Sequence, residues 1–240
     1  MKKQIIVHLF KCRIFSVFIF VLLLFSCIPI AKLATGFKNP EVLDLNGIIK
    51  EKNKTFLLDE TIDLVYKEAK DSAEIVRILS ESFNGQINIY NTKGERLCFK
   101  EKLTCTSYQL SELQNSGSEI IGNCPKIDLD DELSNLSTIL EKLTDYDLER
   151  NFEIENFANY DYIFIYYWSS FIASDKSMKS EYDYVKKSLD STNLKYIILR
   201  INCDLREDWG LKKGEKQKIL FEKKGKRKYE LAFGNIPWKN

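Results

Sequence analysis

The clearest pattern of hydrophobic and polar positions lies in residues 150–240 of the chain. Residues 162–168 and 196–202 are apolar runs of the kind that form strands buried on both faces of a sheet. Between them, apolar residues recur every three or four positions over 174–189, which predicts an amphipathic helix. A strand, a helix and a strand at this spacing predict parallel strands joined by a right-handed crossover. Two short alternating segments within 218–232 then predict an antiparallel hairpin.

The pattern is less regular over residues 56–149, where we expect a mixed α+β region. Apolar steps of three and four over 59–83 predict one amphipathic helix, and residues 86–99 alternate about a turn and predict a hairpin. We expect a short helix within 107–121 and a longer one over 128–143. The acidic residues at the start of the longer helix can be interpreted as calcium ligands or as charges that complement the helix dipole. We favour the second interpretation, because the glycine and the distal glutamate of a calcium-binding loop are missing.

A basic and then apolar leader opens the chain. Its basic residues, with no acidic residue among them, are Lys2, Lys3, Lys11 and Arg13. An apolar run follows and ends in Leu24-Phe25-Ser26-Cys27, an order of parts that is typical of an export signal. This ending resembles the lipobox of bacterial lipoproteins. The resemblance implies that Cys27 is lipidated, by diacylglycerol or palmitate, and becomes the new N-terminus.

Two other interpretations of the leader stay open. Extended over residues 14–31, the apolar run reaches the roughly 17–25 residues that span a bilayer, and would then be an uncleaved signal anchor. Free secretion would need a small-x-small cleavage site, and Lys32 two positions before Ala34 fits that pattern poorly. We favour the lipoprotein, then the anchor. All three interpretations place residues 40–240 outside the cytoplasm, on the periplasmic side of the cell envelope.

Composition indicates a folded protein rather than a linker. Aromatic residues make up 12% of the chain, which has only 10 Gly and 4 Pro. The roughly 200 residues after the leader are enough for one domain or two small ones. We expect a signal peptide or anchor over 1–27, a tether over 28–55, the mixed region over 56–149 and a further domain over 150–240.

Charge is unevenly distributed although the formal net charge is only +1. Residues 211–240 hold ten basic residues against three acidic ones. A strip of this kind can meet anionic lipid headgroups or nucleic acid, or can simply face solvent. The solvated face is the interpretation that we favour, and we expect no nucleic-acid partner because an exported protein seldom meets one.

The only histidine, His8, lies in the leader. The mature chain therefore has no Ser-His-Asp or Cys-His nucleophile and no imidazole metal ligand. We expect no catalytic residue, no metal site and no cofactor.

Three cysteines are close in sequence, namely Cys98, Cys105 and Cys124. None of their spacings is C-x-x-C, and a disulfide within this group or separate buried thiols are equally compatible with the sequence. Cys203, at the end of an apolar run, is interpreted as a buried thiol.

A βαβ unit followed by a hairpin, with Ile163-Phe164-Ile165-Tyr166-Tyr167-Trp168-Ser169-Ser170-Phe171 as its first strand, resembles the thioredoxin fold over residues 150–240. The fold class that the resemblance implies is α/β, with a thioredoxin-like βαβ unit and hairpin. Ser169 stands where that family has its nucleophilic cysteine, and no proline precedes the hairpin. Disulfide exchange needs a thiolate, which serine cannot supply.

These features predict an envelope-anchored, non-catalytic thioredoxin-like protein with a binding or supporting role. Its expected partners are the membrane, through the lipid or anchor, and an envelope protein. The alternative is an atypical thiol-disulfide enzyme or redox sensor that uses Cys98, Cys105 and Cys124.

Overall fold

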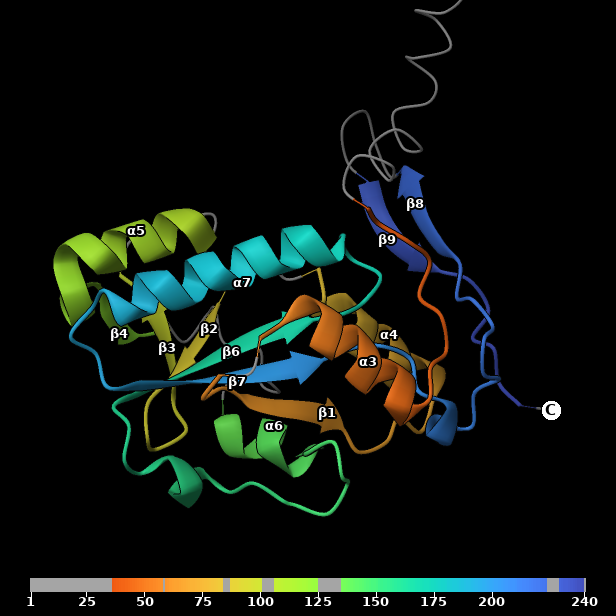
Figure 1. Ribbon diagram of the computed structural model, residues 1–240, viewed down its shortest axis with the longest axis horizontal. Helices are drawn as coiled ribbons and strands as arrows, with labels where there is room; N and C mark the ends of the chain where they lie inside the picture. Colours follow the sequence, from red (N-terminus) through yellow and green to blue (C-terminus); the bar gives the residue numbers. More distant parts are fainter. Residues whose placement is uncertain are drawn as a thin grey trace, which may run out of the picture.

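The computed structural model describes residues 36–57, 59–83, 87–100, 106–124, 135–223 and 229–239. These residues form a seven-stranded mixed sheet with helices on both faces, and a separate two-stranded sheet (Figure 1). The expected α/β class is therefore confirmed. In this part of the chain no helix is long and apolar enough to cross a membrane. Cys27 and Cys105 lie outside the described residues.

The seven-stranded sheet combines three parallel strands with antiparallel strands on either side. From edge to edge its strands are β4 (Ile121–Asn123), β3 (Arg96–Phe99), β2 (Asn88–Tyr90), β6 (Tyr162–Trp168), β7 (Tyr196–Asn202), β1 (Ile62–Tyr66) and β5 (Leu143–Thr144). β6, β7 and β1 are parallel, and the other neighbours pair antiparallel.

Two apolar clusters fill the spaces on the two faces, because successive strand residues point to opposite sides. Ile163 and Ile165 pack with α4 (Ser72–Glu81) and α6 (Leu136–Glu141). Phe164 and Tyr166 pack on the other face, with the helices α3 (Leu45–Thr55), α5 (Thr106–Ser116) and α7 (Asp175–Asp190). Figure 1 shows α5 and α7 lying along one side of the sheet and α6 on the other. Short 3-10 helices occupy Gly117–Ile120, Ile154–Phe157 and Glu207–Trp209.

The predicted βαβ unit is confirmed as β6, α7 and β7. The two strands pair in parallel register from Tyr162 opposite Tyr196 to Trp168 opposite Asn202. Ser174 caps α7, since its side chain accepts a hydrogen bond from the backbone of Ser177. The crossover places α7 over the middle of the sheet.

The prediction of one helix over 59–83 is wrong in its first part. Residues Ile62–Tyr66 form β1, which pairs with β7 on one side and β5 on the other. The helix α4 begins only at Ser72, where the Asp71 side chain accepts from the backbone of Glu74. A short apolar run fits helical and extended periodicity alike, so pairing with β7 decides its conformation.

The segment predicted to be an extended tether contains α3 and packs against the fold. Asp44 caps this helix by accepting from the backbone of Gly47 at 2.8 Å. Val42 and Ile48 are fully buried. Backbone hydrogen bonds from Val42 N to Glu215 O and from Leu43 N to Leu205 O connect the residues before α3 to the C-terminal part of the chain. Residues 28–35 lie outside the described part.

The predicted boundary at residue 150 does not divide the sheet, because β2 pairs with β6. The hairpin predicted over 86–99 is confirmed as β2 and β3. The short helix expected within 107–121 is α5, which begins one residue earlier and ends at Ser116. The second hairpin, β8 (Ile219–Lys223) and β9 (Tyr229–Phe233), also forms. It makes its own sheet, however, instead of extending the sheet that contains β6 and β7. Of the helix predicted over 128–143, the structure has α6, and residues 128–134 lie outside the described part.

Candidate functional site

The carboxyl ends of the parallel strands are the first place to look for a site, because ligands of open α/β sheets bind there. Asp204, just after β7, is only 1% exposed. It accepts from the backbone N (2.9 Å) and Oγ (2.9 Å) of Ser170, which follows β6, and from Asn202 Nδ2 (2.8 Å). Burial raises the pKa of Asp204 to about 6, and the bonds from Asn202 and Ser170 oppose that rise. Asp204 thus ties the loops after β6 and β7 together.

Ser169, the first residue after β6, lies inside the protein. Its side chain is fully buried and its hydroxyl has no hydrogen-bond partner among the described residues. A hydroxyl in this position cannot reach a ligand from solvent.

A cavity of about 340 Å³ opens beside these loops. Its walls come from the chain before α3, from α3, from the loop after β6 and from the segment before β8. The lining residues are Lys38, Asn39, Glu41, Leu43, Glu51, Ser170, Phe171 and Lys216. Lys216 Nζ and Glu41 Oε2 are 3.5 Å apart. The cavity thus combines both signs of charge with one aromatic wall.

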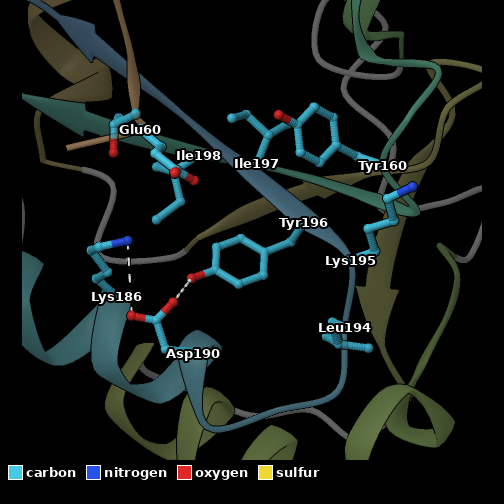
Figure 2. A pocket seen from close by; sticks show the side chains of 10 residues that line it. Glu60, Tyr160, Lys186, Asp190, Leu194, Lys195, Tyr196, Ile197 and Ile198 are labelled. Atoms are coloured by element: carbon cyan, nitrogen blue, oxygen red, sulfur yellow. Dashed lines mark hydrogen bonds and ion pairs between the residues drawn. The ribbon is translucent and has the colours of Figure 1, made fainter.

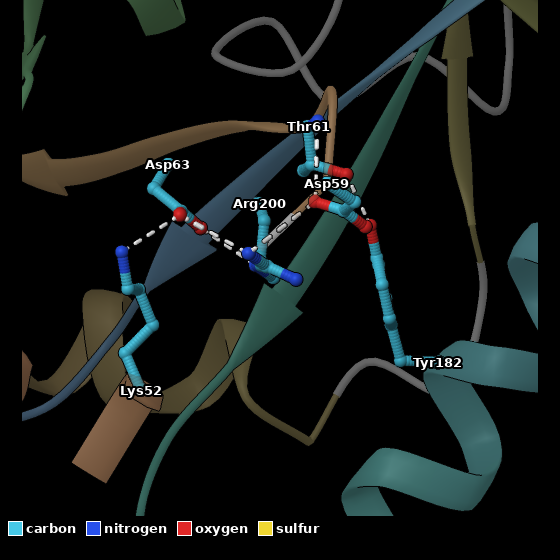
Figure 3. A network of polar contacts seen from close by, with 6 residues as sticks. All are labelled: Lys52, Asp59, Thr61, Asp63, Tyr182 and Arg200. Carbon is cyan, nitrogen blue, oxygen red and sulfur yellow. Dashed lines mark hydrogen bonds and ion pairs between the residues drawn. The ribbon is translucent and has the colours of Figure 1, made fainter. Parts of the chain in front are cut away.

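A second polar cluster surrounds Arg200, in the middle of β7 (Figure 3). Arg200 is 2% exposed, and its Nε and Nη2 donate to the two carboxylate oxygens of Asp63 on β1 at 2.6 and 3.0 Å. Lys52 on α3 donates to the same carboxylate at 3.0 Å. Burial acts to lower the pKa of Arg200, but the hydrogen bond and the charge of Asp63 outweigh it and the pKa is raised.

Aromatic rings cover the guanidinium of Arg200 on the α3 and α7 side of the sheet. Its central carbon lies 4.2 Å from the ring centre of Phe56 and 4.8 Å from that of Tyr182. The Tyr182 hydroxyl donates to Asp59 at 2.8 Å, and Asp59 also lies 3.8 Å from Arg200. With Lys52 and Asp63, two cations face two carboxylates. This charge balance indicates a structural role, in which the cluster holds β1, β7, α3 and α7 together.

A smaller cavity of about 270 Å³ lies at the opposite, amino end of β7 (Figure 2). Figure 2 shows Tyr196 pointing toward Asp190, to which its hydroxyl donates at 2.6 Å. Lys186 lies 3.8 Å from the same carboxylate. The polar groups on this wall of the cavity therefore bind one another.

The cysteines differ from one another in accessibility. Cys98 on β3 and Cys124 just after β4 form a disulfide, which is one of the two arrangements compatible with the sequence. Both residues are partly exposed. Cys203 is fully buried, as expected, and burial raises the pKa of its thiol well above the ordinary value.

The sequence interpretation missed the polar residues that these clusters use. Arg200 carried a signal, because a charged residue inside an apolar strand has to be paired when it is buried. Asp63 gave no such signal, since the strand that holds it was interpreted as a helix. No group of three histidine, cysteine, aspartate or glutamate residues in the described ranges could hold a metal ion.

Comparisons with protein-family models, with curated proteins and with solved structures gave no match for this chain.

Proposed function

We propose that this chain is an exported α/β protein, anchored in the bacterial cell envelope, that acts by binding or supporting a partner rather than by catalysis. The observation that carries the proposal is the disulfide between Cys98 and Cys124. Disulfides persist in oxidising compartments and are rare in the cytosol. The pair lies far in sequence from the leader, so it supports export independently of residues 1–27.

The arrangement of the nucleophilic side chains supports a non-catalytic role. Ser169 and Cys203 are fully buried at the carboxyl ends of β6 and β7. Ser170 uses both its backbone N–H and its hydroxyl to hold Asp204. A nucleophile has to be reachable and close to a base, and Ser169 and Cys203 are not reachable from solvent.

The cavity beside Ser170 and Phe171 is the proposed binding surface. It lies at the carboxyl ends of the parallel strands, and acidic and basic side chains line it together. Such a lining suits a peptide segment, whose backbone and side chains offer both donors and acceptors, better than a wholly apolar ligand.

The thioredoxin-like part of the proposal rests on β6, α7 and β7. In this arrangement the antiparallel neighbour of β6 is β2, from the hairpin β2–β3 that precedes the βαβ unit in the chain. The fold would then be a thioredoxin-like one in which an earlier hairpin takes the place of the later one. This interpretation is compatible with the sheet order β3-β2-β6-β7.

The test is the intact mass of the protein extracted from membranes. The proposal expects a chain that begins at a diacylglyceryl-modified Cys27, or an uncleaved chain if residues 14–31 are an anchor, with Cys98 and Cys124 oxidised. A chain recovered from the cytosol with all thiols reduced would contradict it. Cross-linking in intact cells, with and without Glu51→Lys in the cavity, would then test for a partner at that surface.

An atypical thiol-disulfide enzyme or redox sensor is the second candidate. The observation that favours it is the partial exposure of Cys98 and Cys124, which lets another thiol reach the disulfide. Turnover in an insulin-reduction assay that disappears in Cys98→Ser would support this candidate. A disulfide that stays oxidised and inactive in that assay would exclude it.

A further inference from the structure

Strand β7 extends beyond β1 at its amino end. The first pair between these two parallel strands is Ile62 opposite Leu199, whereas β7 begins at Tyr196. On its other side β7 is paired with β6 from Tyr196 onward. Within the described part of the chain, residues 196–198 therefore have a neighbouring strand on one side only.

The backbone of this part of β7 is turned alternately toward β6 and toward the vacant side. Successive residues of a parallel strand direct their N–H and C=O groups to opposite neighbours. At its two ends β7 is bonded to the β6 side through the backbone of Lys195 and of Cys203. The odd-numbered residues therefore face β6, and Tyr196 and Ile198 face the side of β1.

Glu60 is the residue that would pair with this edge if the β1–β7 ladder continued. In the register of the two strands, its N–H would donate to Tyr196 O and its C=O would accept from Ile198 N. Neither hydrogen bond is present, and no other described residue bonds to these two groups. Ile198 is only 3% exposed. Buried backbone groups are rarely left without a partner, so this N–H and this C=O mark a position that water or a ligand fills.

The ladder stops because side-chain bonds hold residues 59–61 against α7. The Asp59 carboxylate accepts from Thr61 N at 3.2 Å and from the Tyr182 hydroxyl at 2.8 Å (Figure 3). The hydroxyls of Thr61 and Tyr182 are also hydrogen-bonded to each other. A short side-chain turn of this kind competes with strand pairing for the backbone. Specific contacts thus keep the gap beside β7 open.

The cavity of about 270 Å³ at the amino end of β7 lies at this gap (Figure 2). Its lining includes Glu60, Thr61 and residues 196–198. The side chains of Lys186 and Asp190 on another wall already interact with each other. The cavity is slightly smaller than the roughly 300–1,000 Å³ of sites for drug-sized ligands, which suits a short segment of chain.

We propose that this gap binds an extended peptide segment of a partner protein, whose backbone continues the sheet beside residues 196–198. One residue of the segment takes the place that Glu60 leaves vacant, donating to Tyr196 O and accepting from Ile198 N. A peptide backbone offers this donor and this acceptor on a single residue, and strand addition is a recurring mode of peptide recognition.

The surroundings of the gap suit such a segment. Glu60 and Lys195, both exposed, add one charge of each sign to the lining, and Leu194 adds an apolar side chain. Polar and apolar side chains of a bound segment therefore both find a neighbour. The site is separate from the cavity beside Phe171 and does not depend on how the chain is anchored.

The test is an NMR titration of the full chain, labelled with nitrogen-15, with the blocked tripeptide acetyl-Val-Thr-Val-amide. Its β-branched residues favour an extended backbone, and its blocked ends carry no charge. We expect a dissociation constant of about 1 mM, because few hydrogen bonds form. The Ile198 amide proton should move downfield. At about ten times the dissociation constant, its exchange with solvent should be about tenfold slower.

The control peptide has the same sequence with a methyl group on the nitrogen of each of its three residues. Methylation removes the donors that would bond to Tyr196 O and keeps the side chains. This peptide should bind at least about tenfold more weakly. Equal binding of the two peptides would overturn the proposal, because the cavity would then recognise side chains rather than backbone.

The test variant is Glu60→Trp, which adds an indole to the lining of the cavity at an exposed position. The matched control is Glu68→Trp, at an exposed glutamate beyond the other end of β1. The test variant should lose the shift of the Ile198 amide, and the control should keep it. Amide signals of β6 and β7 report whether each variant is folded. The comparison of the two peptides on the wild type depends on neither variant.

Two further outcomes would overturn the proposal. An Ile198 amide that does not shift up to about 10 mM peptide would show that water, rather than a peptide, fills the gap. A shift at Ser170 without one at Ile198 would assign the peptide to the cavity beside Phe171. Neither outcome affects the proposed export, which is carried by the disulfide.

Discussion

Asp63 on β1 and Arg200 on β7 face each other in register across two central parallel strands, and two hydrogen bonds of 2.6 and 3.0 Å join their side chains. The guanidinium is almost wholly buried under Phe56 and Tyr182. The pair therefore contributes both to the register of the two strands and to the position of α7 above them.

Removal of Asp63 should be costly because it leaves the charge of Arg200 uncompensated inside the protein. We expect Asp63→Ala to lower the free energy of unfolding by about 3 kcal/mol, in the range found when one partner of a buried pair is deleted. Urea unfolding followed by circular dichroism measures this. The double variant Asp63→Leu with Arg200→Met should be less destabilised than Asp63→Ala. Equal losses in the two proteins would show that the charge is not the cause.

Asp204 should make stability depend on pH. Its folded-state pKa is raised to about 6 by burial, above an unfolded value of about 3.9. Its contribution to stability is therefore fully present below pH 4 and is lost as the pH rises through 6. The corresponding free energy is about 3 kcal/mol between these limits. Between pH 4 and pH 7, the unfolding free energy of the wild type should therefore fall by about 3 kcal/mol relative to that of Asp204→Asn. A difference that is constant from pH 4 to pH 7 would contradict the raised pKa.

The disulfide between Cys98 and Cys124 closes a loop whose ends are 26 positions apart. Cross-links of this kind restrict the unfolded chain and typically contribute about 2–4 kcal/mol. Replacing both cysteines by serine should lower the unfolding free energy by that amount. A reducing agent should destabilise the wild type equally and leave the double variant unchanged. Destabilisation of the double variant by the reductant would point to another cross-link.

Ile48 tests whether residues before position 56 belong to the folded domain. It is fully buried on α3, against the same cluster as Trp168 and Met178. Ile48→Ala should lower the unfolding free energy by about 3 kcal/mol, as for other large-to-small core replacements. Lys50→Ala, on the exposed side of the same helix, is the control and should change it by less than about 0.5 kcal/mol. A small effect at Ile48 would restore the interpretation of this segment as a tether.

Strong local patterns identified the elements that the fold confirmed. The runs 162–168 and 196–202 with the amphipathic segment between them suffice for β6, α7 and β7, because a short continuous apolar run is typical of a buried strand and apolar steps of three and four are typical of a helix. The hairpins β2–β3 and β8–β9 followed from alternation about a turn. The weaker pattern of 59–83 fitted two conformations, and neighbouring strands decided between them.

The candidate site was less accessible to sequence reasoning, because its residues come from distant parts of the chain. Asp204 meets Ser170, and Arg200 meets Asp63, only after β1, β6 and β7 are side by side. Contacts between residues far apart in the chain cannot be recognised in a single sequence. Hydrophobic periodicity can be, because it is a property of neighbouring residues.

The sequence by itself determined the α/β class, the βαβ unit, the single histidine at position 8 and the basic character of residues 216–230. These depend on composition and on spacing between near neighbours. Only the tertiary structure decided that residues 40–55 belong to the core, that β2 joins β6, and that the basic hairpin lies beside the start of the domain. Each of these depends on contacts between segments far apart in the chain, which are selected by burial and pairing in the folded protein rather than by local propensity.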